Sequence, residues 1–153
     1  MCARVEVVVI RSPYVAIPSS PTNQPTNLPR RAQLAVAHKD HSITLRGASD
    51  GALPVSHLKA HMTAISALRF NVDGSELASG DASGVVVLWS VEGGVPTAIL
   101  PHTGGGAIRS LAYNEALGPS HRQVAAGLDD GRVWMWSITD KEEPPRVVEG
   151  HTR

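Results

Sequence analysis

Three short stretches of the sequence carry residue types that could do chemistry. GASDG (47–51) has the Gly-x-Ser-x-Gly pattern of a hydrolase nucleophile, HKDH (38–41) offers two imidazoles and a carboxylate to a metal, and GGG (104–106) could present amides to a phosphate. The first needs a strand before the serine and a helix after it, the second needs further ligands, and the third needs a following helix. The elements around each stretch therefore decide which chemistry is available.

The flanking sequence favours none of these three settings. ALPV (52–55) follows the first stretch, and Ser49 is expected in a hairpin rather than at a strand-to-helix turn. His38 and His41 are expected in a tight turn without the further ligands of a closed metal site. No convincing acid–base pair stands among Glu115, Asp129 and Asp130. We therefore predict a non-enzymatic protein with no catalytic, cofactor-binding or metal-binding residues.

Composition and charge narrow the class of protein. The 153 residues suit one domain, 42% of them are hydrophobic, and 14 Lys and Arg balance 14 Asp and Glu. A net charge of zero gives no field that would attract nucleic acid or an anionic membrane. The single cysteine, Cys2, excludes an intrachain disulfide, and the apolar run at 7–10 is too short for a signal sequence or a membrane span. We expect a cytoplasmic protein without nucleic-acid or membrane partners.

Glycine and proline divide the chain into short segments. The 14 glycines and 11 prolines separate short runs rich in Val, Ile, Leu and Ala, which favours many short strands. The stretch AHMTAISALRF (60–70) has apolar residues at helical as well as strand spacing, so periodicity alone does not assign it.

One phrase occurs twice in the chain. LASGDASGVVVLWS (77–90) is matched by VAAGLDDGRVWMWS (124–137), which places Trp89 and Trp136 at the same position of two repeats. A histidine precedes each copy, and similar segments follow both histidines. The stretch 60–70 is therefore predicted to be a strand by its place in the repeat.

A third, weaker copy lies upstream. LAVAHKDHSITLR (34–46) aligns with the same phrase and puts Arg46 where the other copies have tryptophan. SPYVAI (12–17) is then expected to be the first strand of this unit, and ARVEVVVI (3–10) a strand left over from an earlier unit. The sequence 149–153 begins a further unit.

These repeats resemble the WD-repeat family, whose units have four strands and form the blades of β-propellers. The resemblance implies an all-β fold, a partial β-propeller of about three four-stranded blades. The expected divisions are a leftover strand at 1–11, a first blade at 12–60 with a Pro-rich insertion at 18–31, a second blade at 61–101, a third blade at 102–150, and the start of a further repeat at 151–153.

The family resemblance also implies a structural network of His, Ser or Thr, Asp and Trp in each blade. The residues assigned to it are Asp40, His61, Ser79, Trp89, His102, Asp130, Trp136 and His151. Ser83 stands where the second unit should have aspartate, and Ala126 where the third should have serine. Because no copy is complete, we expect weaker blades than those of an ideal repeat.

Other residues are candidates for contact with a partner. They are His38, Lys39, Asp81, Asp129 and Trp134. Trp134 has two interpretations: it packs between neighbouring blades, or it is an exposed aromatic anchor. The outer sheet faces of a three-blade unit would be apolar and uncovered. We therefore expect that the isolated chain is either a piece of a longer protein or self-associates through these faces.

One resemblance goes beyond the general repeat. Residues 80–89, 102–113 and 140–151 are similar to the late blades of the actin-interacting protein 1 family. That resemblance implies binding to actin and cofilin, promotion of filament disassembly, and a cytoplasmic, cytoskeletal location. The alternative is a generic WD-repeat scaffold subunit of another complex, such as one in RNA processing or ubiquitin ligation.

Overall fold

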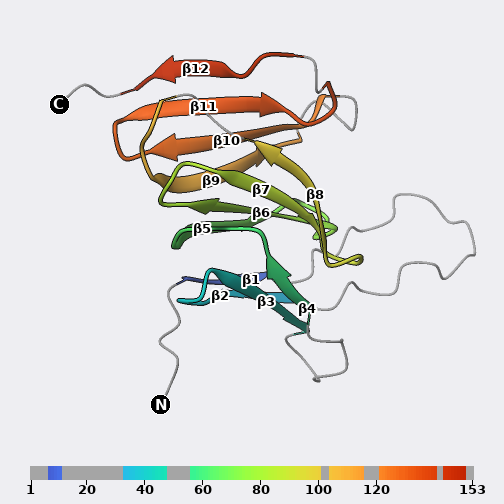
Figure 1. Cartoon of the computed structure of the whole chain (residues 1–153). Helices are drawn as coiled ribbons and strands as arrows, with labels where there is room; N and C mark the ends of the chain where they lie inside the picture. The colour runs from blue at the N-terminus through green and yellow to red at the C-terminus, as the bar shows by residue number, and fades with distance from the viewer. Residues whose placement is uncertain are drawn as a thin grey trace, which may run out of the picture.

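The computed structural model describes residues 7–11, 33–47, 56–100, 104–115, 121–140 and 143–150. Its regular elements in this part of the chain are strands, arranged as three four-stranded antiparallel sheets (Figure 1). The all-β prediction is confirmed. No helix in the described ranges is long and apolar enough to cross a membrane.

Each sheet is built from four strands that are consecutive in the chain. The first sheet contains β1 (Val7–Arg11), β2 (Gln33–Ala37), β3 (Ser42–Gly47) and β4 (Ser56–Lys59). The second contains β5 (Ile65–Phe70), β6 (Glu76–Asp81), β7 (Val86–Ser90) and β8 (Val95–Leu100). The third contains β9 (Ile108–Asn114), β10 (Gln123–Leu128), β11 (Arg132–Ser137) and β12 (Arg146–Glu149). Within each sheet every strand pairs with the next strand in sequence, so each sheet has the strand order of a meander.

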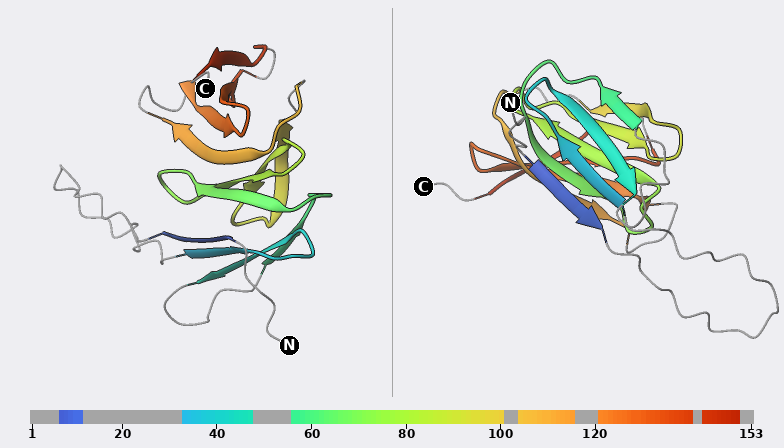
Figure 2. Two further views of the ribbon diagram at one scale, coloured as in Figure 1. Left: turned by 90° about the vertical axis from the view of Figure 1, so that its left-hand side faces the viewer. Right: turned by 90° about the horizontal axis from the view of Figure 1, so that it is seen from below.

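The three sheets stack face to face in chain order (Figures 1 and 2). The backbones of neighbouring sheets approach each other mainly at their first strands, β1, β5 and β9. This is the arrangement of propeller blades, in which the first strand of every blade lies nearest the common axis.

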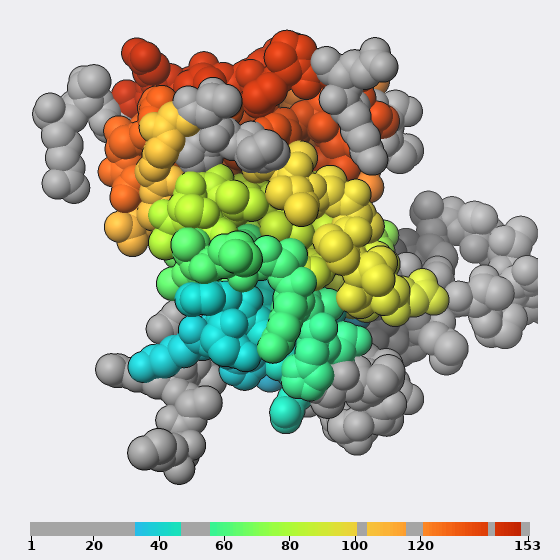
Figure 3. All heavy atoms as spheres, viewed as in Figure 1, coloured from blue at the N-terminus to red at the C-terminus, as the bar shows by residue number. Residues whose placement is uncertain are grey.

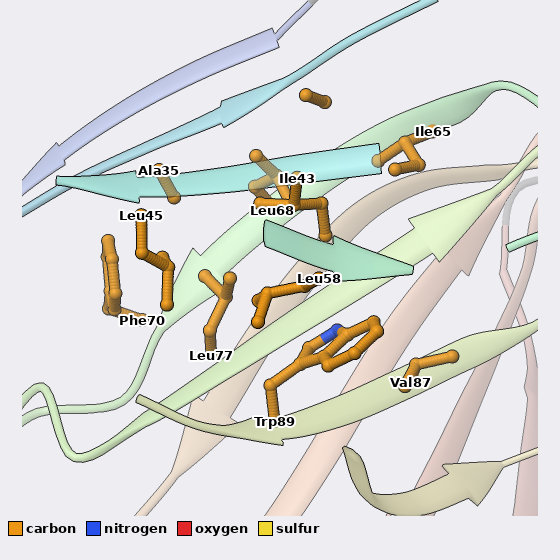
Figure 4. Close-up of a cluster of buried hydrophobic side chains, with 11 residues drawn as sticks. Ala35, Ile43, Leu45, Leu58, Ile65, Leu68, Phe70, Leu77, Val87 and Trp89 are labelled. Atoms are coloured by element: carbon orange, nitrogen blue, oxygen red, sulfur yellow. The ribbon is translucent and has the colours of Figure 1, made fainter. Parts of the chain in front are cut away.

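A continuous apolar core joins the first two sheets (Figure 4). Its members are Ala35, Ala37, Ile43, Leu45, Leu58, Ile65, Leu68, Phe70, Leu77, Val87 and Trp89. The indole of Trp89 is only 1% exposed, although it carries a polar N–H group. Burial of each large side chain contributes about 1.5–3 kcal/mol, so this core is the main link between the two sheets.

A second core joins the second and third sheets, whose atoms are in close contact in the space-filling view (Figure 3). Ile108 on β9 is fully buried against Gly80 on β6, and a Cβ added at Gly80 would lie 2.8 Å from the Cβ of Ile108. The Ser66 hydroxyl also donates a hydrogen bond to the carbonyl oxygen of Ile108. The missing side chain at Gly80 therefore allows the third sheet to approach closely.

The stretch 60–70, which periodicity left unassigned, contains β5. Ile65, Leu68 and Phe70 point into the core between the first two sheets, while Arg69 is exposed. The prediction of a strand from its place in the repeat is confirmed.

The first strand of the first sheet differs from the prediction. β1 pairs with β2 over five residues, from Val7 with Ala37 to Arg11 with Gln33. Residues 7–10 are therefore not left over from an earlier unit, and that prediction is wrong. The expected strand at 12–17 and the insertion at 18–31 lie outside the described residues. A long connection adds little closure entropy, so a strand distant in sequence can complete the sheet.

Candidate functional site

A chain of buried hydrogen bonds joins three side chains of the second sheet to a histidine in the connection that precedes it. Trp89 Nε1 donates to Ser79 Oγ over 2.8 Å, and Ser79 Oγ lies 2.6 Å from His61 Nε2. His61 Nδ1 lies 2.7 Å from Asp81 Oδ2. The connection after β4 supplies His61, β6 supplies Ser79 and Asp81, and β7 supplies Trp89. The structure thus brings together the three residues that were assigned to this network.

The donor and acceptor roles follow from the chemistry of the groups. An ionised carboxylate only accepts, so His61 Nδ1 donates to Asp81. Ser79 Oγ lies 2.6 Å from His61 Nε2 and donates to the carbonyl oxygen of Val87 over 3.4 Å. Burial opposes ionisation of Asp81, but hydrogen bonds from Ser83 and His61 and from the backbone N–H of Val85 hold its pKa below the ordinary value. Asp81 is therefore an ionised, fully bonded centre of the network.

Asp81 was predicted to face a partner, and this is wrong. Its side chain is 2% exposed, and its second carboxylate oxygen accepts from Ser83 N, Ser83 Oγ and Val85 N. The family usually has aspartate at the position of Ser83. In this chain the carboxylate is supplied by Asp81, two residues earlier. Residues two apart on a strand share a face, so the placement of Asp81 beside Ser79 was a readable signal.

The order Ser79–His61–Asp81 has the connectivity of a nucleophilic triad. Ser79 is fully buried, and its oxygen accepts a hydrogen bond from Trp89 and lies within hydrogen-bonding distance of His61. A substrate cannot reach this oxygen in the folded state. In this sheet the three residues join β6 to the connection before β5, and Trp89 adds β7 to the network.

The third sheet repeats the tryptophan but not its polar partners. Register places Ala126 and Leu128 where the second sheet has Ser79 and Asp81. Trp136 Nε1 has no hydrogen-bond partner among the described residues. His102 and His151, both assigned to the network, lie outside those residues.

Two further residues of the third sheet had predicted roles. Asp130, assigned to the network, lies in the exposed turn after β10 and accepts hydrogen bonds from Arg132 N at 2.9 Å and Arg132 Nε at 2.8 Å. Its place in the network involves His102, which lies outside the described residues, and stays a prediction. Trp134, a candidate for partner contact, is 6% exposed and stacks on Trp136 with ring centroids 6.2 Å apart. The two indoles share one face of β11 because they are two residues apart. Of the two interpretations of Trp134, packing between blades is the one observed.

The first sheet departs furthest from the repeat. Asp40, also assigned to the network, is exposed and accepts from Ser42 N at 3.2 Å and Ser42 Oγ at 2.5 Å, which closes the turn between β2 and β3. His38 Nε2 lies 2.8 Å from Thr44 Oγ1 in a half-buried contact. Arg46, opposite Leu34, is exposed at the tryptophan position.

One edge of the stack forms a surface that we call the turn face. It comprises the turns at 38–42, 81–85 and 128–132 and the connections at 60–64 and 104–107. Backbone hydrogen bonds from Ala82 N to Ala64 O (2.9 Å) and from Asp129 N to Ala107 O (3.0 Å) tie turns to connections. The side chains on this face are therefore held on a fixed frame.

Several side chains of the turn face are exposed, and three of them are candidates for contact with a partner. Lys39 and Asp129, both predicted to face a partner, are exposed, although Asp129 also accepts a 3.0 Å hydrogen bond from Ala107 N. Met62 is 88% exposed and was not predicted. Its signal was its position directly after His61, where the chain must leave the buried network before β5 begins.

The other chemical stretches do not form ligand sites in the described residues. Arg132 Nη2 donates to the carbonyl oxygens of Gly104 (3.0 Å) and Gly105 (3.4 Å), so this loop turns carbonyls, rather than amides, toward a cation. No group of three His, Cys, Asp or Glu side chains within those residues could hold a metal ion. Ser49 lies outside them.

The opposite edge carries a polar clamp between the second and third sheets. Arg122, just before β10, pairs with Glu76 at the start of β6 and with Glu115 after β9, the latter at 3.2 Å. A shallow groove of about 310 Å³ lies beside this pair and is lined also by Leu88 and Ile138. The clamp therefore links the second and third sheets.

Comparison with known proteins places the chain. The family model described as "WD domain, G-beta repeat" matches residues 52–90 and 94–137, more than half of the chain. The zebrafish (Danio rerio) protein "WD repeat, SAM and U-box domain-containing protein 1" is 28% identical over 109 residues, which are 71% of this chain and 22% of that protein. The chain thus spans about a fifth of that relative.

Solved structures show the same fold. A chain of the "Crystal Structure of Mitotic Checkpoint Complex" has a TM-score of 0.64 at 18% identity, over 78% of this chain and 35% of that chain. The Cps50 (Swd1) β-propeller domain of Myceliophteria thermophila has a TM-score of 0.61 at 20% identity, over 76% and 35%. Together with the three stacked sheets and the repeated tryptophan, these matches show that the chain belongs to the WD-repeat family and forms part of a β-propeller.

Proposed function

We propose that the chain is a non-enzymatic module that binds another protein through its turn face. The observation that carries this proposal is Met62, which is 88% exposed between turns fixed by backbone hydrogen bonds. Burial of an exposed apolar side chain against a partner gains free energy in proportion to the apolar area removed from water, and a fixed backbone avoids a further entropy loss from ordering the loop. Lys39 on the first sheet and Asp129 on the third add opposite charges to the same face, one on each side of the second sheet, which favours one orientation of the partner.

Actin, acting together with cofilin, is the partner that we propose for this face. Support comes from the resemblance of residues 80–89, 102–113 and 140–151 to the actin-interacting protein 1 family. The proposed activity is display of the turn face to the filament so that disassembly by cofilin proceeds faster. The corresponding location is the cytoplasm, at actin filaments.

A second candidate is a scaffold subunit of a different complex, such as one in RNA processing or ubiquitin ligation. The curated relative supports it, because its name combines WD repeats with SAM and U-box domains. In this case the same turn face would bind a neighbouring subunit instead of actin.

A filament pelleting assay with the whole chain, with and without cofilin, tests the actin proposal. Two exposed apolar residues on opposite edges give matched variants, Met62→Glu on the turn face and Val72→Glu in the turn between β5 and β6, where Val72 is 64% exposed. We expect wild type and Val72→Glu to increase soluble actin equally in the presence of cofilin, and Met62→Glu to require at least tenfold more protein.

Each possible result decides one part of the proposal. No effect of the wild-type chain on filaments removes actin as the partner. An equal effect of Met62→Glu and wild type removes the turn face as the binding surface. Cross-linking in cells tests the scaffold candidate. A defined protein that cross-links to wild type and to Val72→Glu, but not to Met62→Glu, supports it. Equal cross-linking to all three contradicts it.

A further inference from the structure

The outer strand of the second sheet, β8, has an edge that no described strand covers. It pairs with β7 on one side, and outside that pairing none of its backbone groups bonds to another described residue. The outward N–H and C=O groups of such a strand are a template for a further strand. The second sheet lies between the other two, and β8 (yellow) is on the surface in the space-filling view (Figure 3). This edge therefore belongs to the middle of the chain.

The outer strands of the three sheets differ in charge. β4 carries His57 and Lys59, and β12 carries Arg146 and Glu149, all of them exposed. Charged side chains on an edge strand oppose its pairing with another chain. The sequence of β8, VPTAIL, contains no charged residue and no histidine. Among the described outer strands, β8 is thus the one without this protection.

The side chains that β8 exposes are suited to a strand pairing. Val95 is 53% exposed and Ile99 is 58% exposed. Thr97 is also exposed, although its hydroxyl donates to the carbonyl oxygen of Leu88 over 3.2 Å. β-Branched side chains pack well against one another across paired strands. The edge therefore fits an uncharged strand that itself carries β-branched residues.

β8 of a second copy is a strand of this chemistry. Two copies related by a two-fold axis pair antiparallel, and opposite side chains then point to the same side of the joined sheet. A pairing centred on Ala98 sets Thr97 opposite Ile99 of the second copy, so β-branched residues meet. It sets Leu100 opposite Pro96, whose missing N–H falls at the end of the paired stretch. No like charges meet at any position of this pairing.

We propose that two copies of this chain join through their β8 strands into one antiparallel sheet of eight strands. The order β5-β6-β7-β8 of one copy continues as β8-β7-β6-β5 in the other. A two-fold contact uses the same strand on both copies, so association stops at two. A single pair of short strands makes a small, transient interface, and we expect a dissociation constant on the order of 100 µM. The proposal does not use the turn face or any partner bound there.

Sedimentation equilibrium at protein concentrations around that value, from about tenfold below to about fivefold above, tests the association. We expect the mean mass to rise from the 16.2 kDa of one chain toward twice that mass. Ile99→Lys places a charge of each copy at the joined edge and should raise the dissociation constant at least tenfold. Val72→Lys adds the same charge at a 64% exposed position in the turn between β5 and β6, and should leave it unchanged. A wild type that stays monomeric, or equal dissociation constants for the two variants, overturns the proposal.

A cysteine cross-link tests the site of contact separately. In a Cys2→Ser background, Ile99→Cys places a thiol one position from the two-fold axis in each copy, within the span of a short bis-maleimide. Met62→Cys, at an 88% exposed position of the turn face, is the matched control. We expect at least tenfold more linked dimer from Ile99→Cys than from Met62→Cys. Equal linkage of the two variants contradicts pairing through β8, and a mass that grows beyond two copies contradicts the two-fold contact.

Discussion

Trp89 and Trp136 occupy the same strand position in neighbouring sheets but are held by different forces. Both indoles are at most 5% exposed and face the preceding sheet. Trp89 Nε1 donates to Ser79 within a network that ends at Asp81. Trp136 lies instead beside Ala126 and Leu128 and stacks on Trp134. The repeat therefore keeps the shape of a blade while the interior of the blade changes from polar to apolar.

This difference has a physical cost and a physical benefit. Each hydrogen bond of the second sheet contributes only about 1 kcal/mol net, but loss of one partner leaves buried polar groups unsatisfied. Among the described residues of the third sheet, the Trp136 N–H and the Tyr113 hydroxyl are buried without a hydrogen-bond partner, and the additional indole of Trp134 fills space with apolar surface. We expect substitutions of polar residues to show the difference in stabilisation between the two sheets more clearly than substitutions of apolar residues.

The largest expected effect is at Asp81. Asp81→Ala leaves His61 Nδ1 and the N–H groups of Ser83 and Val85 without their acceptor inside the fold. We expect a loss of about 3–5 kcal/mol in the free energy of unfolding, measured by urea denaturation. Asp130→Ala, in the exposed turn of the third sheet, is the matched control and should cost less than about 1 kcal/mol. Equal losses at the two positions would show that the second sheet does not depend on the buried carboxylate.

Acid should reveal the same carboxylate with a smaller effect. Hydrogen bonds in the folded state hold the pKa of Asp81 below its ordinary value, which the unfolded chain regains. The stabilisation is therefore complete above the unfolded pKa of about 3.9 and is lost as the pH falls through the lower folded pKa. We expect Asp81→Asn to show a weaker fall in stability between about pH 5 and pH 2 than wild type. Asp40→Asn should keep the share of the acid-induced loss of stability that is due to Asp81. If stability falls with pH at the same slope in wild type and in Asp81→Asn, this assignment is contradicted.

The smallest effect concerns the three equivalent turns. Gly84 and Gly131 have φ angles of 91° and 87°, whereas His41 occupies the same turn position in the first sheet with a φ of 65°. A side chain is strained in this left-handed region, so His41→Gly should stabilise the protein by about 0.5–1 kcal/mol. Thermal unfolding provides the measurement, and Gly84→Ala should have the opposite sign. A destabilised His41→Gly would mean that contacts of the imidazole outweigh the backbone strain.

Repetition made most of the fold predictable. The spacing of Trp89 and Trp136 fixed the register of two sheets, and the same alignment identified β5 although its periodicity was ambiguous. The first strand of the first sheet was missed because the prediction chose the segment nearest in sequence. Pairing of β1 with β2 depends on contacts across the stack, which a local pattern does not contain.

Family positions identified His61, Ser79 and Trp89, but strand alternation was needed to identify the buried residues outside those positions. Asp81 and Trp134 each lie two residues from a buried partner on the same strand, so both had to point inward. The family pattern places the network aspartate at the position of Ser83. Asp81, which takes this role two residues earlier, was therefore not assigned to the network. Exposure of Met62 depends on the packing of the connection against β5 and could not be read from residue type.

A double-mutant cycle between Ser79→Ala and Trp89→Phe tests the central claim, that a buried polar network holds the second sheet. The indole N–H donates to the Ser79 hydroxyl over 2.8 Å, so the two changes should couple by about 1–2 kcal/mol in the free energy of unfolding. The corresponding cycle in the third sheet, Ala126→Ser with Trp136→Phe, calibrates the apolar arrangement. A coupling energy near zero for Ser79 and Trp89 would contradict the account.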